Sequence, residues 1–149
     1  MKSLVLFVSF LVGINALDQS LIEEKKQQII EWGLECAESE KATPEDIEAL
    51  KNHQPPVSHQ GRCLLFCVNK KLQLMNEDGS INVPHTTWLD KVKADDSELF
   101  EKLSKVYHSC IDKVTPKSDG CDTALDLVSC LKEEGEKDGL NKIFHPDRK

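Results

Sequence analysis

The sequence predicts an all-α fold, a compact bundle of about six helices held together by three disulfides. Several segments repeat apolar residues at steps of three and four, which is the spacing of one face of a helix. No segment alternates apolar and polar residues over enough positions to indicate a strand. The chain also carries six cysteines behind what reads as a secretory leader, and an even cysteine count is typical of small extracellular folds that rely on disulfides.

Residues 1–16, MKSLVLFVSFLVGINA, are interpreted as a signal peptide, because one lysine precedes a short apolar run and the small Ala16 suits the cleavage position. The run is too short to span a bilayer, so we expect no stable membrane insertion. Residues 17–149 then form one domain, long enough to bury a core. Loss of Lys2 changes the formal net charge from −7 to −8, and this acidity argues against binding to nucleic acid.

The first two helices are predicted at residues 21–38 and 44–50. The second begins with Thr43 as N-cap and Pro44 in the first turn, followed by acidic residues. It must end before residues 55–56, a pair of prolines. The first has a face of apolar or small residues, with Glu and Lys elsewhere, formed by Ile22, Ile29, Gly33 and Cys36.

The third helix is predicted over residues 59–75 and is apolar on most sides, so it has to be buried. Cys63 and Cys67 lie four residues apart on one of its faces. Their Cβ atoms are then roughly 5–6 Å apart, whereas a disulfide needs about 3.5–4.5 Å. Each of these cysteines should therefore bond to a different segment.

Two further helices follow a loop at residues 76–80. Pro84 is expected to start a short helix over residues 84–92. Asp95 is the predicted N-cap of the next, with Glu98 as its capping-box partner. That helix carries the most regular apolar stripe of the chain, formed by Leu99, Leu103, Val106, Cys110 and Val114.

The sixth helix is predicted over residues 121–134. It is apolar on several faces and therefore central. The run KEEGEKDG after it reads as solvated. Residues 136–149 are left as a tail, in which Leu140, Ile143 and Phe144 fall at helical spacing.

Geometry alone does not settle how the cysteines pair. Six cysteines allow fifteen pairings. We exclude Cys63–Cys67 by the distance above. We also exclude Cys121–Cys130, which would lie roughly 13 Å apart along one helix. Ten pairings remain, and local spacing does not choose among them.

The cysteine spacing C-x26-C-x3-C-x42-C-x10-C-x8-C resembles that of the insect odorant-binding proteins of the pheromone-binding and general odorant-binding protein (PBP/GOBP) family. The x3 and x8 gaps are the specific part of this pattern, and the segments KLQLMNEDGS and SDGCDTALDLVSCL are also similar to the family. The resemblance implies helices around an apolar cavity. It also implies the disulfides Cys36–Cys67, Cys63–Cys121 and Cys110–Cys130.

The same resemblance implies a secreted carrier of small apolar ligands, such as long-chain alcohols, esters or aldehydes, in the fluid around chemosensory neurons. A chemosensory receptor is an expected partner, and the protein is expected to be a monomer or a homodimer. With the family in view, we expect the pocket wall to include Leu74, Met75, Val83, Trp88, Leu89, Val92, Leu103, Tyr107, Ile111, Ala124 and Val128, with Phe144 contacting the ligand from a tail that closes as a lid. For each wall residue, ordinary packing is the alternative, and for the tail the alternative is a frayed end.

The sequence contains no catalytic motif such as G-x-S-x-G or H-E-x-x-H, so we expect no enzyme. We also expect no metal and no other cofactor. The segment from Leu74 to His85 fails as a calcium loop, because both ends should be acidic. His108 and His145 are the candidates for a pH-dependent release of ligand.

Two other functions stay open at this stage. One is a non-olfactory carrier of the same fold, for hormones, lipids or toxins in other body fluids. The other is an interaction or defence protein whose interior is packed solid.

Overall fold

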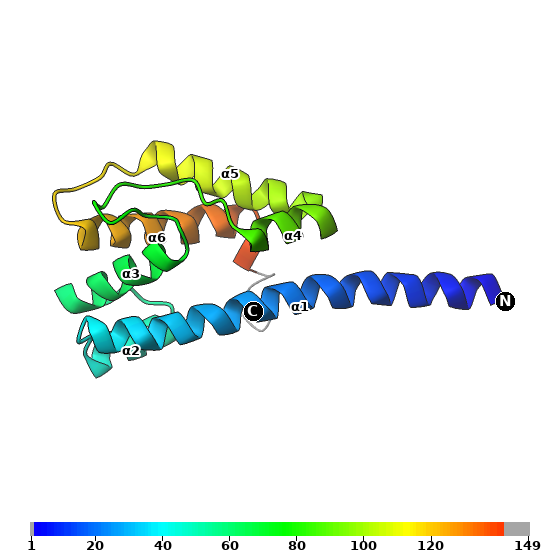
Figure 1. Cartoon of the computed structure of the whole chain (residues 1–149), viewed down its shortest axis with the longest axis horizontal. Helices are drawn as coiled ribbons and strands as arrows, with labels where there is room; N and C mark the ends of the chain where they lie inside the picture. Colours follow the sequence, from blue (N-terminus) through cyan, green and yellow to red (C-terminus); the bar gives the residue numbers. More distant parts are fainter. Residues whose placement is uncertain (1, 142–149) are drawn as a thin grey trace.

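The computed structural model describes the backbone of residues 2–141 and the side chains of residues 19–141. Figure 1 shows the helices α1 (Lys2–Ser39), α2 (Pro44–Lys51), α3 (His59–Lys71), α4 (Thr87–Asp95), α5 (Ser97–Lys113) and α6 (Gly120–Lys137). Within this part of the chain the β-type pairing is one isolated antiparallel bridge between Met75 and Ile81. The predicted all-α fold is confirmed.

The helices pack in an order that leaves α3 and α6 at the centre. α3 lies against α6 and α1, α5 lies against α6 and α4, and α1 also reaches α4. In Figure 1, α1 runs along one side of the bundle, with α4, α5 and α6 on the other. No helix among the described residues is long and apolar enough to cross a membrane.

Three disulfides connect the central helices. Cys36–Cys67 joins α1 to α3, Cys63–Cys121 joins α3 to α6, and Cys110–Cys130 joins α5 to α6. This is the pairing that the family resemblance implied. Cys63 and Cys67 bond to different helices, as their spacing on one helix face requires.

A buried carboxylate joins α2 to the start of α3. The Thr43 hydroxyl caps α2 as predicted, and Asp46 completes a capping box with it. Asp46 also accepts hydrogen bonds from the backbone N–H groups of Val57 and Ser58, each at 3.0 Å, and from the Ser58 hydroxyl. Gly61 packs so closely here that a Cβ would lie 2.5 Å from the Asp46 Oδ1. The extended link between the two helices is therefore fixed.

Two predicted helix starts are wrong by one to three residues. α4 begins at Thr87 instead of Pro84, because the Thr86 side chain accepts a hydrogen bond from the Leu89 N–H and acts as the N-cap. α5 is capped by Asp96, whose Oδ1 accepts from the Leu99 N–H at 2.9 Å. Asp95, the predicted cap, is instead the last residue of α4.

The predicted third helix is too long. α3 ends at Lys71, and Gln73 takes a left-handed backbone conformation with φ of +60°. The Leu74 and Met75 N–H groups then bond to the Asn69 carbonyl. Leu74 and Met75 remain buried, but on a returning loop. Their apolar character reflects core packing of a loop and was mistaken for continued helix.

Two other helices are longer than predicted. α1 extends back through the segment interpreted as a signal peptide, whose removal stays a prediction, and α6 continues to Lys137. Part of the charged run KEEGEKDG is therefore helical.

The buried apolar side chains form three clusters. The α4–α5 core consists of Ile22, Leu89, Val92, Leu99, Leu103, Val106 and Leu140. The α6 core consists of Leu65, Leu74, Met75, Cys110, Ala124 and Leu127. A smaller α1–α3 core consists of Cys36, Ala37 and Leu64.

Candidate ligand-binding site

Tyr107 of α5 lies where the two larger cores meet. Its side chain packs against both the α4–α5 core and the α6 core, yet it is only partly buried. Burial nevertheless raises the pKa of Tyr107 to about 12, so the phenol stays protonated and can donate a hydrogen bond. The side chains of residues 19–141 give its hydroxyl no hydrogen-bond partner. A phenol that packs against both cores, keeps some accessible surface and has no hydrogen-bond partner among the described residues is suited to the polar head of a ligand.

Most of the predicted wall residues fall around this point. Four contribute to the α6 core or pack against it, namely Leu74, Met75, Ala124 and Val128. Four more contribute to the α4–α5 core or pack against it, namely Trp88, Leu89, Val92 and Leu103. Val83 and Ile111 are partly buried without belonging to either group. Phe144 and His145 lie outside the described residues, and His108 is exposed on α5. Contact with a ligand stays a prediction for the whole set.

Sequence reasoning missed several residues of this region. Leu131 packs against both larger cores, as Tyr107 does. On α1, partly buried Lys25, Ile29 and Trp32 lie between buried Ile22 and the buried Cys36 at steps of three and four. These five positions form an inner stripe that faces the bundle. The sequence already placed Ile22, Ile29 and Cys36 on this face, and the regular steps between them could have identified Lys25 and Trp32 as well.

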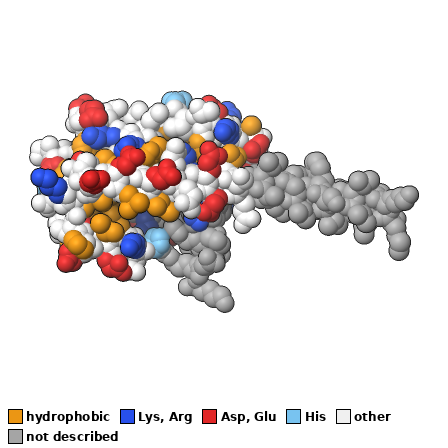
Figure 2. Space-filling model, turned by 60° about the horizontal axis from the view of Figure 1, so that its bottom comes forward, with side chains coloured by type: hydrophobic (Ala, Val, Ile, Leu, Met, Phe, Trp, Pro, Cys, Tyr) orange, Lys and Arg blue, Asp and Glu red, His pale blue; other side chains and the backbone are white. Residues whose placement is uncertain are grey.

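The opposite face of α1 is exposed. Ile30 and Leu34 have 54% and 63% of their surface accessible. Figure 2 turns the side of α1 and α2 toward the viewer and shows apolar side chains reaching the surface between charged ones. The inner stripe is therefore distinct from the outward apolar residues of the same helix.

Lys25 is the one charged member of the inner stripe. Its ammonium lies 5.3 Å from the ring centre of Trp32 and 5.5 Å from that of Trp88, within the range of cation–π attraction. Trp88 is held by a 3.0 Å hydrogen bond from its Nε1 to the Leu21 carbonyl. Burial lowers the pKa of Lys25, and nearby Lys91 acts in the same direction, whereas the Glu24 carboxylate opposes the shift. We call this group of residues at the contact of α1 and α4 the α1–α4 junction.

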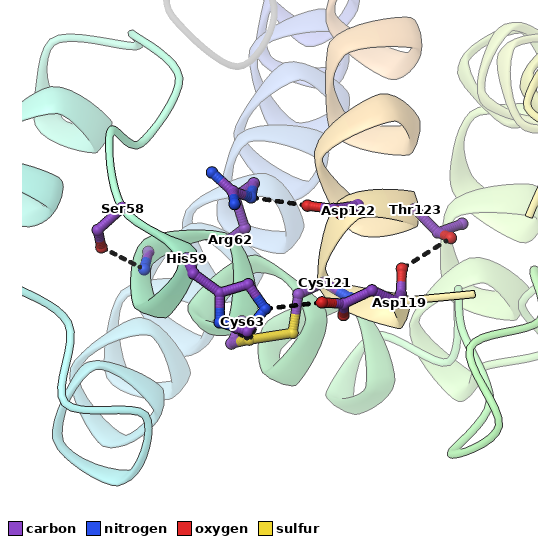
Figure 3. Close-up of a disulfide and its surroundings, with 9 residues drawn as sticks. Ser58, His59, Arg62, Cys63, Asp119, Cys121, Asp122 and Thr123 are labelled. Atoms are coloured by element: carbon purple, nitrogen blue, oxygen red, sulfur yellow. Dashed lines mark hydrogen bonds and ion pairs between the residues drawn. A yellow bond between two sulfur atoms is a disulfide. The ribbon is translucent and has the colours of Figure 1, made fainter. Parts of the chain in front are cut away.

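The starts of α3 and α6 are joined by polar contacts as well as by a disulfide. Figure 3 shows the Cys63–Cys121 bond with the His59 ring beside it. The His59 Nε2 lies 2.7 Å from an Asp119 carboxylate oxygen, and the Arg62 Nε lies 2.8 Å from that of Asp122. Together with the disulfide, this hydrogen bond and this ion pair form what we call the α3–α6 clasp, which joins the starts of the two central helices.

Neither of two other features suits an apolar ligand. His59, Cys63 and Cys121 present nitrogen and sulfur atoms within 4.8 Å of one another, but the sulfurs are bonded to each other and are not thiolate ligands. A hollow of about 720 Å³ lies between the end of α5 and α6. Its lining is largely charged, with Lys113, Lys117, Asp126, Glu133, Glu134 and Lys137.

The described helices thus define a class of protein, a disulfide-linked helical bundle whose two larger apolar cores meet at a partly buried tyrosine. The chain belongs to the PBP/GOBP family, whose model matches residues 18–134. This confirms the family predicted from the cysteine spacing. The family is one of binding and carrier proteins for small hydrophobic ligands, not of enzymes.

Known proteins agree with this assignment. The chain is 36% identical over 145 residues to general odorant-binding protein 19d of Drosophila melanogaster, covering 94% of this chain and 96% of that protein. It is 28% identical over 139 residues to odorant-binding protein 10 of Aedes aegypti, covering 90% of each. Among solved structures, Odorant-binding protein dmelOBP28a from Drosophila melanogaster matches with a TM-score of 0.63 at 24% identity, covering 80% of this chain and 98% of that one. That likeness supports the fold.

Proposed function

We propose that this protein is a secreted carrier that binds small hydrophobic ligands, odorants or pheromones, where the α4–α5 and α6 cores meet. The observation that carries the proposal is Tyr107. Its side chain packs against both cores and is partly buried, and its hydroxyl has no hydrogen-bond partner among the described residues. Long-chain alcohols, esters and aldehydes combine an apolar chain with one hydrogen-bonding head, and this combination fits a phenol surrounded by apolar side chains.

The expected affinity is moderate. A ligand that buries about ten methylene groups gains roughly 8 kcal/mol. Association costs at least about 4 kcal/mol, and close packing with one hydrogen bond offsets part of that cost. Micromolar binding corresponds to about −8 kcal/mol. Reversible binding of this strength is suited to a carrier that must release its ligand.

The proposed compartment is the fluid around chemosensory neurons, and the proposed recipient of the ligand is a chemosensory receptor. A leader cleaved after Ala16 supplies the route of secretion. Sequencing the N-terminus of protein purified from the medium of insect cells that express the 149-residue sequence tests this step. A start at or near Leu17 supports it, and retention of residues 1–16 contradicts it.

The carrier function is tested by titrating the secreted protein with an apolar fluorophore, next to a reduced sample. We expect saturable one-site binding that is lost on reduction and displaced by long-chain alcohols. Tyr107→Phe removes one hydroxyl and keeps the ring. It should weaken binding of 1-dodecanol several-fold and leave binding of the fluorophore unchanged. Absence of binding by protein with correct disulfides would contradict the proposal.

A further inference from the structure

We propose that Lys25, set between Trp32 and Trp88, binds the carboxylate head of a long-chain carboxylic acid at the α1–α4 junction. This inference rests on the proposed carrier function and narrows it, because it names a charged class of ligand and the group that recognises it. It places the acid head at a different residue from the Tyr107 hydroxyl, which we assign to uncharged heads.

The first support is the position of Lys25 on the inner stripe of α1. The stripe is otherwise apolar or aromatic, and both of its ends are buried at Ile22 and Cys36. The helix surface that carries Lys25 contacts α4, where Trp88 packs against the α4–α5 core. The ammonium therefore lies beside two aromatic side chains at a partly buried position.

The second support is the lack of a carboxylate partner. No acidic group of residues 19–141 lies within ion-pair distance of the Lys25 ammonium, whose hydrogen-bond acceptor is the Gln28 side-chain amide; the adjacent Glu24 carboxylate acts on it from a longer distance. The sequence as a whole is acidic, with a formal net charge of −7. The adjacent Lys26 shows the ordinary arrangement, with its ammonium 3.7 Å from the Glu23 carboxylate. An unpaired, partly desolvated cation in an acidic protein is unfavourable, and an anionic ligand relieves that cost.

The third support is the chemistry of the surroundings. A hydrogen bond from an ammonium to a carboxylate is stronger than one between neutral groups. The two indole rings hold the ammonium by cation–π attraction, so the lysine side chain loses little conformational freedom when a ligand binds. Their faces, with Ile22 and Ile29 along the same stripe, offer apolar contact to the first methylene groups of the acid.

The test compares dodecanoic acid with 1-dodecanol, which differ only in the head group. The secreted protein is titrated with each at pH 7.5, with the apolar fluorophore as competitor. The sequence contains two tryptophans, and both flank Lys25, so intrinsic fluorescence reports directly on this junction. Lys25→Met removes the charge and keeps an unbranched apolar chain. Lys26→Met is the matched control, because it removes the neighbouring paired lysine.

We expect Lys25→Met to weaken binding of the acid about tenfold or more and to change binding of the alcohol less than twofold. Lys26→Met should behave as the unsubstituted protein with both ligands. Equal affinity for the acid before and after Lys25→Met overturns the proposal, and so does an equal loss for both ligands, which would assign Lys25 a structural role. Failure of every variant to bind either ligand overturns the carrier function itself. If the alcohol binds but the affinity for the acid does not depend on Lys25, the carrier function stands and only the proposed site at Lys25 is overturned.

Discussion

The α3–α6 clasp and the α1–α4 junction are held together by different means. At the clasp, a disulfide, the His59–Asp119 hydrogen bond and the Arg62–Asp122 ion pair join the helix starts. Buried Asp46 fixes the preceding link. At the junction no disulfide reaches α4. The side-chain hydrogen bond that crosses it within the described residues is that of Trp88 to Leu21, and the remaining contacts are apolar or cation–π.

This difference shows how the molecule can keep a fixed fold and still leave apolar surface incompletely packed. A fully packed core leaves no space for a ligand. A bundle without covalent links between its helices would tend to collapse into any internal cavity. Here the disulfides join α1, α3, α5 and α6, whereas α4 is held by apolar, aromatic and hydrogen-bond contacts. Changes at the clasp should therefore alter stability, and changes at the junction should alter binding.

The largest effect on stability is expected from removing Cys63–Cys121. The double variant Cys63→Ala/Cys121→Ala opens a loop with a sequence separation of 58, so the chain-entropy model gives a loss of about 4 kcal/mol in the free energy of unfolding. Denaturant unfolding followed by circular dichroism measures it. Fluorophore affinity of the remaining folded protein should change little. If the variant keeps its helix content but loses most of its affinity for the fluorophore, the clasp also controls binding, and the division between the two regions is wrong.

Asp46→Asn should cost about 2–3 kcal/mol, because the neutral amide replaces a buried carboxylate that accepts several hydrogen bonds. Those bonds hold the pKa of Asp46 well below its ordinary value of 3.8. Its contribution is therefore complete above about pH 4 and is lost as the pH falls toward the lower folded-state pKa.

The measurement for Asp46 is thermal unfolding between pH 7 and pH 2. The unsubstituted protein should lose stability on acidification more steeply than Asp46→Asn. Parallel pH curves for the two proteins would show that the carboxylate does not carry this part of the acid sensitivity.

Trp88→Phe is expected to lower stability by about 1 kcal/mol through loss of one partly buried hydrogen bond to the Leu21 carbonyl. Its effect on ligand binding should be larger than that of the Cys63–Cys121 double variant, although its effect on stability is smaller. Trp32→Phe is the control for ring size, because no hydrogen bond of the Trp32 side chain joins it to the described residues. Equal stability losses for both variants would mean that the hydrogen bond contributes little.

The smallest effect is expected for His59→Ala. Its contact with Asp119 is accessible to solvent, with 54% of the His59 side chain and 40% of the Asp119 side chain exposed. Exposed pairs contribute within about 1 kcal/mol. Equilibrium unfolding should therefore change slightly, and ligand affinity not at all. A loss comparable to that of Asp46→Asn would show that the ring supports the neighbouring disulfide more than its exposure indicates.

The sequence predicts the frame of this protein better than its site. Helix positions follow from apolar periodicity, and Thr43 with Pro44 is a specific start signal that the structure confirms. The error at Asp95 arises because Asp96 has the same capping chemistry one residue later. Local sequence does not distinguish two adjacent carboxylates, since the choice depends on where the preceding helix ends.

The site is harder to predict because its features come from contacts between distant segments. Tyr107 was identifiable on an apolar stripe, but its unpaired hydroxyl was not. Lys25 reads as a surface charge among neighbouring Glu and Lys residues. It becomes distinctive only when Trp88, more than sixty positions away, packs against it. The helix that carries a residue can thus be predicted correctly from the sequence while the role of that residue is not.

The three disulfides also determine what a protease can release. They span residues 36–67, 63–121 and 110–130, so each interval overlaps the next. Any single cut of the backbone between Cys36 and Cys130 leaves both pieces covalently attached. A protein exposed to extracellular proteases can therefore be nicked in the loops and still keep its fragments in register, and only reduction combined with cleavage separates them.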